Sequence, residues 1–115
     1  MEIQSVFVKP TSRGQRVWLE DTRNNPRLFS CGFEKGARYT RTIENGIVRL
    51  LLDPEGKLKV SGKKLPIIDI SSKNIAGFSD NDELAVIYLE SVITISKCSH
   101  DAIRYHHRKE AEALA

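Results

Sequence analysis

The fold is decided by one stretch, Gly32-Phe33-Glu34-Lys35-Gly36-Ala37-Arg38-Tyr39-Thr40-Arg41-Thr42-Ile43-Glu44-Asn45-Gly46-Ile47-Val48-Arg49-Leu50. Asn45-Gly46 lies between two segments with strand-like alternation, and Asn-Gly tolerates the positive φ that a type I′ turn needs at both central positions. The stretch therefore predicts a β-hairpin with strands over residues 38–43 and 47–52. Alternation assigns one face of the first strand to Tyr39, Arg41 and Ile43, and the other to Arg38, Thr40 and Thr42.

The same pattern returns later in the chain, because Gly32-Phe33 aligns with Gly77-Phe78 at an offset of 45 positions. The apolar positions expected to face inward match without a gap: Tyr39 with Leu84, Ile43 with Tyr88, Val48 with Ile93, and Leu50 with Ile95. Upstream, Val17-Trp18-Leu19-Glu20 aligns with Ile67-Ile68-Asp69, with a longer connecting loop in the first half. Each half is then predicted to contain a strand, a short helical turn, a Gly-Phe pair and a hairpin. One such unit has too little core to stand alone, so two are expected to close a small barrel.

The remaining pattern predicts short strands, brief helical turns and one terminal helix. We expect strands over residues 3–8, 16–20, 57–60 and 66–70, and a second hairpin over 83–90 and 92–96. Helical turns are expected at 27–31 and at 71–76, the latter capped by Ser71 or Ser72. Residues 1–98 are predicted to form the two-repeat barrel, with repeats at about 3–60 and 65–97. Residues 99–115 are predicted to form a helix or the lead-in to a further domain.

Composition indicates one ordinary globular domain. The chain has 115 residues, of which 40% are apolar and 29% charged. No apolar run is long enough for a transmembrane helix, and Met1-Glu2-Ile3-Gln4 lacks the features of a secretory signal. Cys31 and Cys98 lie far apart and form no CxxC motif, which disfavours a disulfide framework and favours a reducing cytoplasm.

Charge is distributed unevenly along the chain. Residues 1–64 carry 13 Lys and Arg against 7 Asp and Glu, a net charge of +6, whereas residues 65–115 carry 5 against 8, a net charge of −3. A basic half suggests a surface for an anionic partner, with nucleic acid as the leading candidate. The alternative is an ordinary solvated surface.

The arrangement resembles the AbrB-like swapped-hairpin barrel, which two chains usually build together and which one chain would build here as a pseudo-dimer. The first half is most similar to the SymE-like branch, on the residues Val17-Trp18-Leu19, Leu28-Phe29, Gly32-Phe33-Glu34-Lys35-Gly36 and Asn45-Gly46. The sequence departs from that pattern at Arg41, where the family has an apolar residue. The resemblance implies DNA binding through basic residues that flank the first strand and its short helix.

The candidate nucleic-acid-binding residues are basic side chains of the first half. Arginine pairs phosphate or guanine in a bidentate way, and flexible lysines suit contact with phosphates regardless of sequence. The candidates around the first strand and helix are Arg13, Arg16, Arg23 and Arg27; further along are Lys35, Arg38, Lys57, Lys59, Lys63 and Lys64. For the last four, protection of an edge strand is the alternative role. The matching hairpin of the second half begins with Asp80, Asp82 and Glu83, so binding is expected to depend on the first half much more than on the second.

The sequence favours a non-enzymatic protein without cofactor or metal. No nucleophile motif or phosphate-binding loop is present. The spacing of Cys98, His100, His106 and His107 matches no zinc pattern. Trp18 is expected in a core or interface rather than stacked on a base. A metal-assisted role for the aligned carboxylates Glu20 and Asp69 is the weaker alternative.

We therefore expect a DNA-binding regulator, or the recognition domain of a bacterial or mobile-element protein, with duplex DNA as its partner and RNA as an alternative. A SymE-like toxin acting on RNA and a protein-interaction module remain open. Residues His100–Glu110 also resemble the lead-in to the catalytic part of phage-type cytosine methyltransferases that carry such a barrel. A homodimer or a larger assembly of that type is compatible with the sequence.

Overall fold

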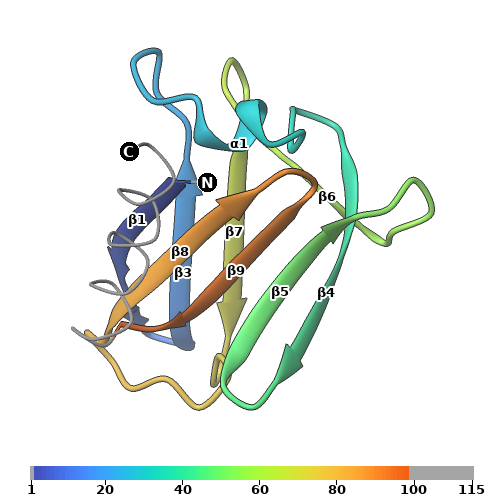
Figure 1. The fold of residues 1–115 in the computed structure, drawn as a ribbon. Helices are drawn as coiled ribbons and strands as arrows, with labels where there is room; N and C mark the ends of the chain where they lie inside the picture. Colours follow the sequence, from blue (N-terminus) through green and yellow to red (C-terminus); the bar gives the residue numbers. More distant parts are fainter. Residues whose placement is uncertain (1, 99–115) are drawn as a thin grey trace, which may run out of the picture.

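The computed structural model describes residues 2–98, which form nine strands and one short helix (Figure 1). A six-stranded antiparallel sheet has the order β1-β8-β9-β5-β4-β6, and a three-stranded antiparallel sheet has the order β2-β3-β7. The bounds are β1 Glu2–Phe7, β2 Lys9–Thr11, β3 Gly14–Glu20, α1 Arg27–Ser30, β4 Arg38–Glu44, β5 Ile47–Leu52, β6 Leu58–Lys59, β7 Ile67–Ser72, β8 Glu83–Leu89 and β9 Val92–Lys97.

The first hairpin has the predicted turn. Asn45 and Gly46 both adopt positive φ, 52° and 76°, as a type I′ turn requires. The turn sets the register of β4 and β5, in which Ile43 lies opposite Val48 and Tyr39 opposite Leu52. The hairpin predicted from the Asn-Gly signal is therefore confirmed.

The second hairpin repeats this register. Leu84 lies opposite Lys97 and Tyr88 opposite Ile93, and each of these positions is 45 residues beyond its counterpart in the first hairpin. Only the turn differs, since Ser91 at φ 65° is the one turn residue here in the left-handed region. The ungapped alignment of the two hairpins is confirmed.

β6 falls within the predicted first repeat of residues 3–60, but its pairing matches it to β1, so we count it with the second half. Each half then places a strand beside the hairpin of the other half. β1 pairs with β8 over six residues, and β6 pairs with β4 over two. Val8 donates its N–H to the carbonyl of Asp82, and Val60 donates to the carbonyl of Ala37, both at 2.9 Å. Because Asp82 and Ala37 are 45 residues apart, Val8 and Val60 are matched residues, and both are buried.

The paired strands β3 and β7 of the smaller sheet face the larger sheet, and they lie behind the diagonal strands β8 and β9 in Figure 1. They pair with Val17 opposite Ile70 and Leu19 opposite Ile68, and all four side chains are buried. Alternating apolar residues of the larger sheet complete a single core that draws on both halves: Val48, Leu50, Leu84, Val86, Ile93 and Ile95.

The match of β3 with β7 corrects the upstream alignment. Val8 and Val60 are matched, so the residues that follow them, Lys9 and Ser61, are matched as well. Lys9 lies opposite Arg16 in β3, and Ser61 lies opposite Ile67 in β7. Arg16 thus matches Ile67, and Trp18 matches Asp69. The predicted alignment of Glu20 with Asp69 is wrong by two residues, because the first connecting loop is longer than the alignment allowed.

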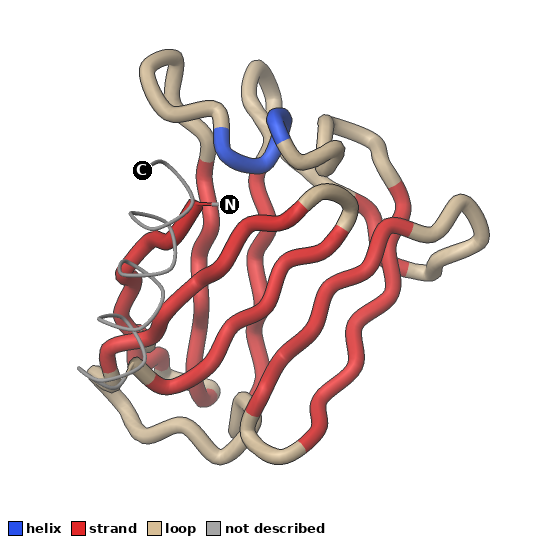
Figure 2. Tube along the Cα trace, viewed as in Figure 1, coloured by secondary structure: helices blue, strands red, loops and turns tan. Residues whose placement is uncertain are grey.

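Three further expectations differ from the structure or fall outside it. Ile43 was expected to face inward but is 50% exposed, because β6 covers β4 only as far as Tyr39. Residues 71–76 form no helical turn; Ser71 and Ser72 end β7, and a series of bends follows (Figure 2). The predicted terminal helix over His100–Leu114 lies outside the described residues. Among residues 2–98, no helix is long and apolar enough to cross a membrane.

Candidate nucleic-acid interface

A buried carboxylate fixes α1 against the end of β3. Asp21 is only 2% exposed, and its two carboxylate oxygens accept the N–H groups of Leu28 at 2.7 Å and Phe29 at 3.0 Å. A helix of four residues has too few internal hydrogen bonds to be stable alone, so these two bonds and the burial of Leu28 define its position. As a result, Phe29 projects outward and the loop before α1 is held at this end of the molecule.

A groove of about 490 Å³ lies beside α1. Three segments far apart in the sequence contribute cations to it: Arg23 from the loop before α1, Lys35 from the loop before β4, and Lys64 from the loop before β7. Lys35 Nζ also donates to the carbonyl of Lys63 at 2.7 Å, which ties two of these loops together. Two acidic residues are among the described residues that line the groove: Glu34 lies at its wall, and the carboxylate of Asp21 is committed to α1.

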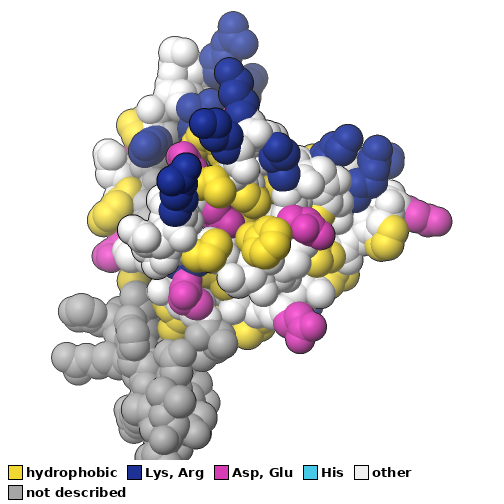
Figure 3. Space-filling view, turned by 90° about the horizontal axis from the view of Figure 1, so that it is seen from above, with side chains coloured by type: hydrophobic (Ala, Val, Ile, Leu, Met, Phe, Trp, Pro, Cys, Tyr) yellow, Lys and Arg dark blue, Asp and Glu magenta, His cyan; other side chains and the backbone are white. Residues whose placement is uncertain are grey.

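The positive charge continues along the same end of the molecule. Arg38 lies opposite Lys59 in the β4–β6 pair, and Arg38 Nη1 donates to the carbonyl of Gly56 at 3.2 Å. Seen from above, Lys and Arg side chains gather over this end (Figure 3). We call this surface the basic face; its residues are Arg23, Lys35, Arg38, Lys57, Lys59, Lys63 and Lys64, all exposed.

The other three predicted arginines have different surroundings. Arg13 lies in the β2–β3 turn, at the opposite end of β3 from Arg23 and separated from it by roughly 20 Å of strand. Arg16 pairs with Asp69 through contacts of 3.0 and 3.1 Å and stacks over Trp18 at 5.1 Å. Arg27 forms an ion pair with Glu2. The four arginines therefore surround β3 and α1 without sharing one surface.

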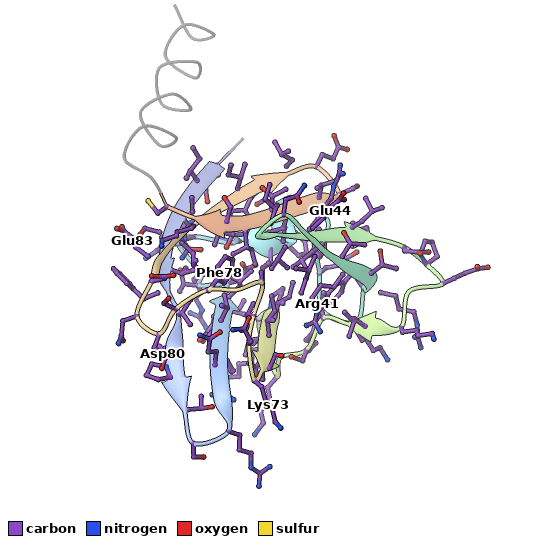
Figure 4. All side chains as sticks on the ribbon, turned by 90° about the horizontal axis from the view of Figure 1, so that it is seen from below. Arg41, Glu44, Lys73, Phe78, Asp80 and Glu83 are labelled. Atoms are coloured by element: carbon purple, nitrogen blue, oxygen red, sulfur yellow. The ribbon has the colours of Figure 1, made fainter. Side chains whose placement is uncertain are left out.

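The opposite end of the molecule carries acidic residues at the matched positions. Asn81 N–H donates to Val8 O just as Gly36 N–H donates to Val60 O, so Asp80 and Glu83 occupy the places of Lys35 and Arg38. Figure 4, seen from below, shows Asp80 and Glu83 on this end together with Lys73. Asp80 accepts a bond from Gln15, and Glu83 accepts one from Ser5.

A second hollow, of about 680 Å³, lies on the other side of α1 and has mixed charge. Glu2, Arg27 and Glu90 line it, together with the half-exposed ring of Phe29 that also borders the basic groove. Burial raises the pKa of Tyr88 at its floor well above the ordinary value, so this phenol stays neutral and donates a hydrogen bond to Gln4 at 2.6 Å. The described residues that line this hollow carry no excess of positive charge.

Two buried polar side chains were not singled out from the sequence. Asp21 holds α1, and Gln15 holds the loop after β7 by donating to the carbonyl of Phe78 at 2.7 Å and accepting the N–H of Ile75 at 2.9 Å. Gln15 reaches across 60 positions of sequence, so no local signal could reveal it. The carboxylate of Asp21, seven positions before Leu28, offered a weak local signal for a cap.

Trp18 is half-buried in β3 and donates from Nε1 to Glu20 at 2.7 Å. In the described part of the chain, no group of three or more His, Cys, Asp or Glu is placed to hold a metal ion. Cys31 is a buried free thiol, and burial raises its pKa; His100, His106 and His107 lie outside the described residues.

Comparisons with known proteins add no family to this geometry. No protein family, curated protein or solved structure was found to match this chain.

Proposed function

We propose that this protein is a DNA-binding module that contacts duplex DNA through its basic face and performs no chemistry of its own. One observation carries the proposal: loops from three separate parts of the chain bring Arg23, Lys35 and Lys64 to one groove. Like charges repel, so gathering them at one end is unfavourable for the isolated protein and favourable when an anion binds. Four more cations extend the surface along β4, β6 and the loop before β7.

The same proposal includes a finer description of the fold, a single-chain swapped-hairpin barrel of the AbrB-like type. What supports it is the exchange of strands, β1 against β8 and β6 against β4, together with the matching registers of the two hairpins. The resemblance of the first half to the SymE-like branch supports it as well. In such barrels the DNA-contacting residues flank the first strand and its short helix, which here are β3 and α1.

Binding through this face is one-sided. The first half presents Lys35 and Arg38 where the second half presents Asp80 and Glu83, and the acidic pair would repel phosphate. A footprint without a palindrome follows, since a palindrome mirrors a true two-fold dimer. The protein would act as a regulator, or as the recognition part of a bacterial or mobile-element assembly such as a methyltransferase, in the cytoplasm.

The test is a titration of duplex DNA at several salt concentrations. Arg23→Ala and Lys64→Ala should each weaken binding and lower the salt slope by about one unit, because each removes one phosphate contact. Lys73→Ala removes an exposed lysine outside the basic face and is the matched control, with little effect expected. Arg16→Ala should have a smaller effect than Arg23→Ala, because Arg16 is engaged by Asp69.

Other outcomes would contradict this interface or support one of the alternative functions. If Lys73→Ala weakens binding as much as Arg23→Ala, the one-sided interface is wrong. Cleavage of RNA by the unmodified protein would favour a SymE-like toxin. Absence of binding to duplex DNA, single strands and RNA alike would favour a protein-interaction module.

A further inference from the structure

Phe29 is a large apolar side chain held in an exposed position. The residue is 58% exposed, yet its backbone N–H donates to the buried carboxylate of Asp21, and its neighbour Leu28 is buried in the core. The ring is therefore presented by a well-anchored segment rather than by a free loop. A single exposed phenylalanine needs no explanation on its own, but this one forms a wall of the basic groove.

The groove combines an apolar wall with cations. Phe29, Leu65 and Pro66 provide the apolar side, and Arg23, Lys35 and Lys64 provide the charge. Its volume of about 490 Å³ lies in the range of pockets that take small ligands, which includes a single nucleotide. A nucleotide has the complementary chemistry, because its base offers a flat apolar face and its phosphate a negative charge.

The two sides of α1 differ in charge, and this difference limits how many DNA strands the surface can hold. On the far side of Phe29, the second hollow carries Glu2 and Glu90, and the one cation among the described residues that line it, Arg27, is already paired with Glu2. A second phosphate backbone on that side would meet the carboxylate of Glu90, while the guanidinium of Arg27 is held by Glu2. The surface around Phe29 is therefore suited to one strand and not to both strands of an intact duplex.

We propose that the groove takes one unpaired nucleotide of the bound DNA, with its base stacked on Phe29 and its phosphate held by Arg23, Lys35 and Lys64. This inference rests on the proposed DNA binding and refines it. A base can reach Phe29 only after leaving its own stack, and unstacking is least costly where the base is unpaired already. The preferred ligand is then a duplex that carries a bulged or unpaired base rather than a perfect duplex.

The test compares two fluorescent probes of the same length and sequence, a perfect duplex and one with a single bulged adenine, in anisotropy titrations at fixed salt. The unmodified protein should bind the bulged probe about tenfold more tightly, because only the bulged probe gains the stacking of one base on an aromatic ring. Phe29→Ala should abolish this preference and leave affinity for the perfect duplex within about twofold. Phe29→Tyr should retain the preference. Leu89→Ala, at an exposed apolar residue of the second hollow, is the matched control and should behave as the unmodified protein.

A second readout reports the stacking directly. A 2-aminopurine in the bulge should be quenched on binding to the unmodified protein and to Phe29→Tyr, but not to Phe29→Ala. Equal affinity of the unmodified protein for both probes would overturn this inference and leave DNA binding intact. Equal loss by Phe29→Ala on both probes would also overturn it, because a structural role would give that result. Binding to neither probe would overturn the proposed function and this inference together.

Discussion

The two hairpins have the same register but different neighbours, and the neighbours decide which residues are buried. β1 covers six residues of β8, whereas β6 covers only two residues of β4. Consequently Tyr88 is 5% exposed, while its match Ile43 is 50% exposed. The matched residues Val86 and Arg41 differ in the same way, because Val86 is buried and Arg41 is exposed. A repeat in sequence therefore fixes strand pairing within each half, but burial depends on strands supplied by the other half.

The two ends of the molecule differ for a related reason. Lys35 and Arg38 at one end match Asp80 and Glu83 at the other, and these exposed positions contribute little to the core. Their charges could diverge while the fold was retained. At these matched positions the backbone hydrogen bonds are alike, and the side-chain charges make one end suited to an anionic partner.

The largest expected effect comes from truncating matched hairpin residues. Tyr88→Ala should lower the free energy of unfolding by about 3–5 kcal/mol, because it empties a buried aromatic site and removes the partner of Gln4. Ile43→Ala should change it by less than about 0.5 kcal/mol, because Ile43 lies on an uncovered strand edge. Urea denaturation measures both. Similar losses would mean that β4 is covered as fully as β8.

An intermediate effect is expected from the two buried polar residues that hold the connecting segments. Asp21→Ala should cost about 2 kcal/mol by leaving the N–H groups of Leu28 and Phe29 without their partner, and Gln15→Ala should cost a similar amount in the other half. Asp53→Ala, which removes a bond to an exposed N–H of Glu55, is the control with a smaller loss. Thermal melts that rank Asp53→Ala with the other two would contradict this assignment.

The smallest effect concerns the two hairpin tips. Gly46→Val should destabilise by about 1 kcal/mol or more, because a β-branched residue resists a φ of 76°. No neighbouring atom lies closer than 3.9 Å to an added Cβ, so the cost is in the backbone alone. Ser91→Gly should stabilise slightly, by about 0.5 kcal/mol, since Ser91 holds a φ of 65°. Unchanged midpoints of unfolding for both variants would contradict this role of positive φ at the two turns.

The sequence predicted local features well and distant ones poorly. Alternation and the Asn45-Gly46 turn were sufficient for both hairpins because strand pairing across a short turn is local. The exposure of Ile43, the bends after Ser72 and the true match of Asp69 depend on contacts with remote strands. For the candidate site, Arg23, Lys35 and Lys64 were recognised as basic residues. Their meeting at one groove, the pairing of Arg16 with Asp69, and the place of Phe29 required the three-dimensional arrangement.

The pairing of β1 with β8 has a consequence for the order of folding. Gln4 and its partner Tyr88 are 84 positions apart, so β1 must wait for the last hairpin to be synthesised before it finds its place. Such distant pairing carries a loop-closure cost before any contact is gained, which slows folding relative to proteins of local topology. Two fragments divided in the exposed loop at Lys63-Lys64 would each hold strands whose partners lie in the other piece. Neither fragment should fold by itself, and mixing them should restore the sheets.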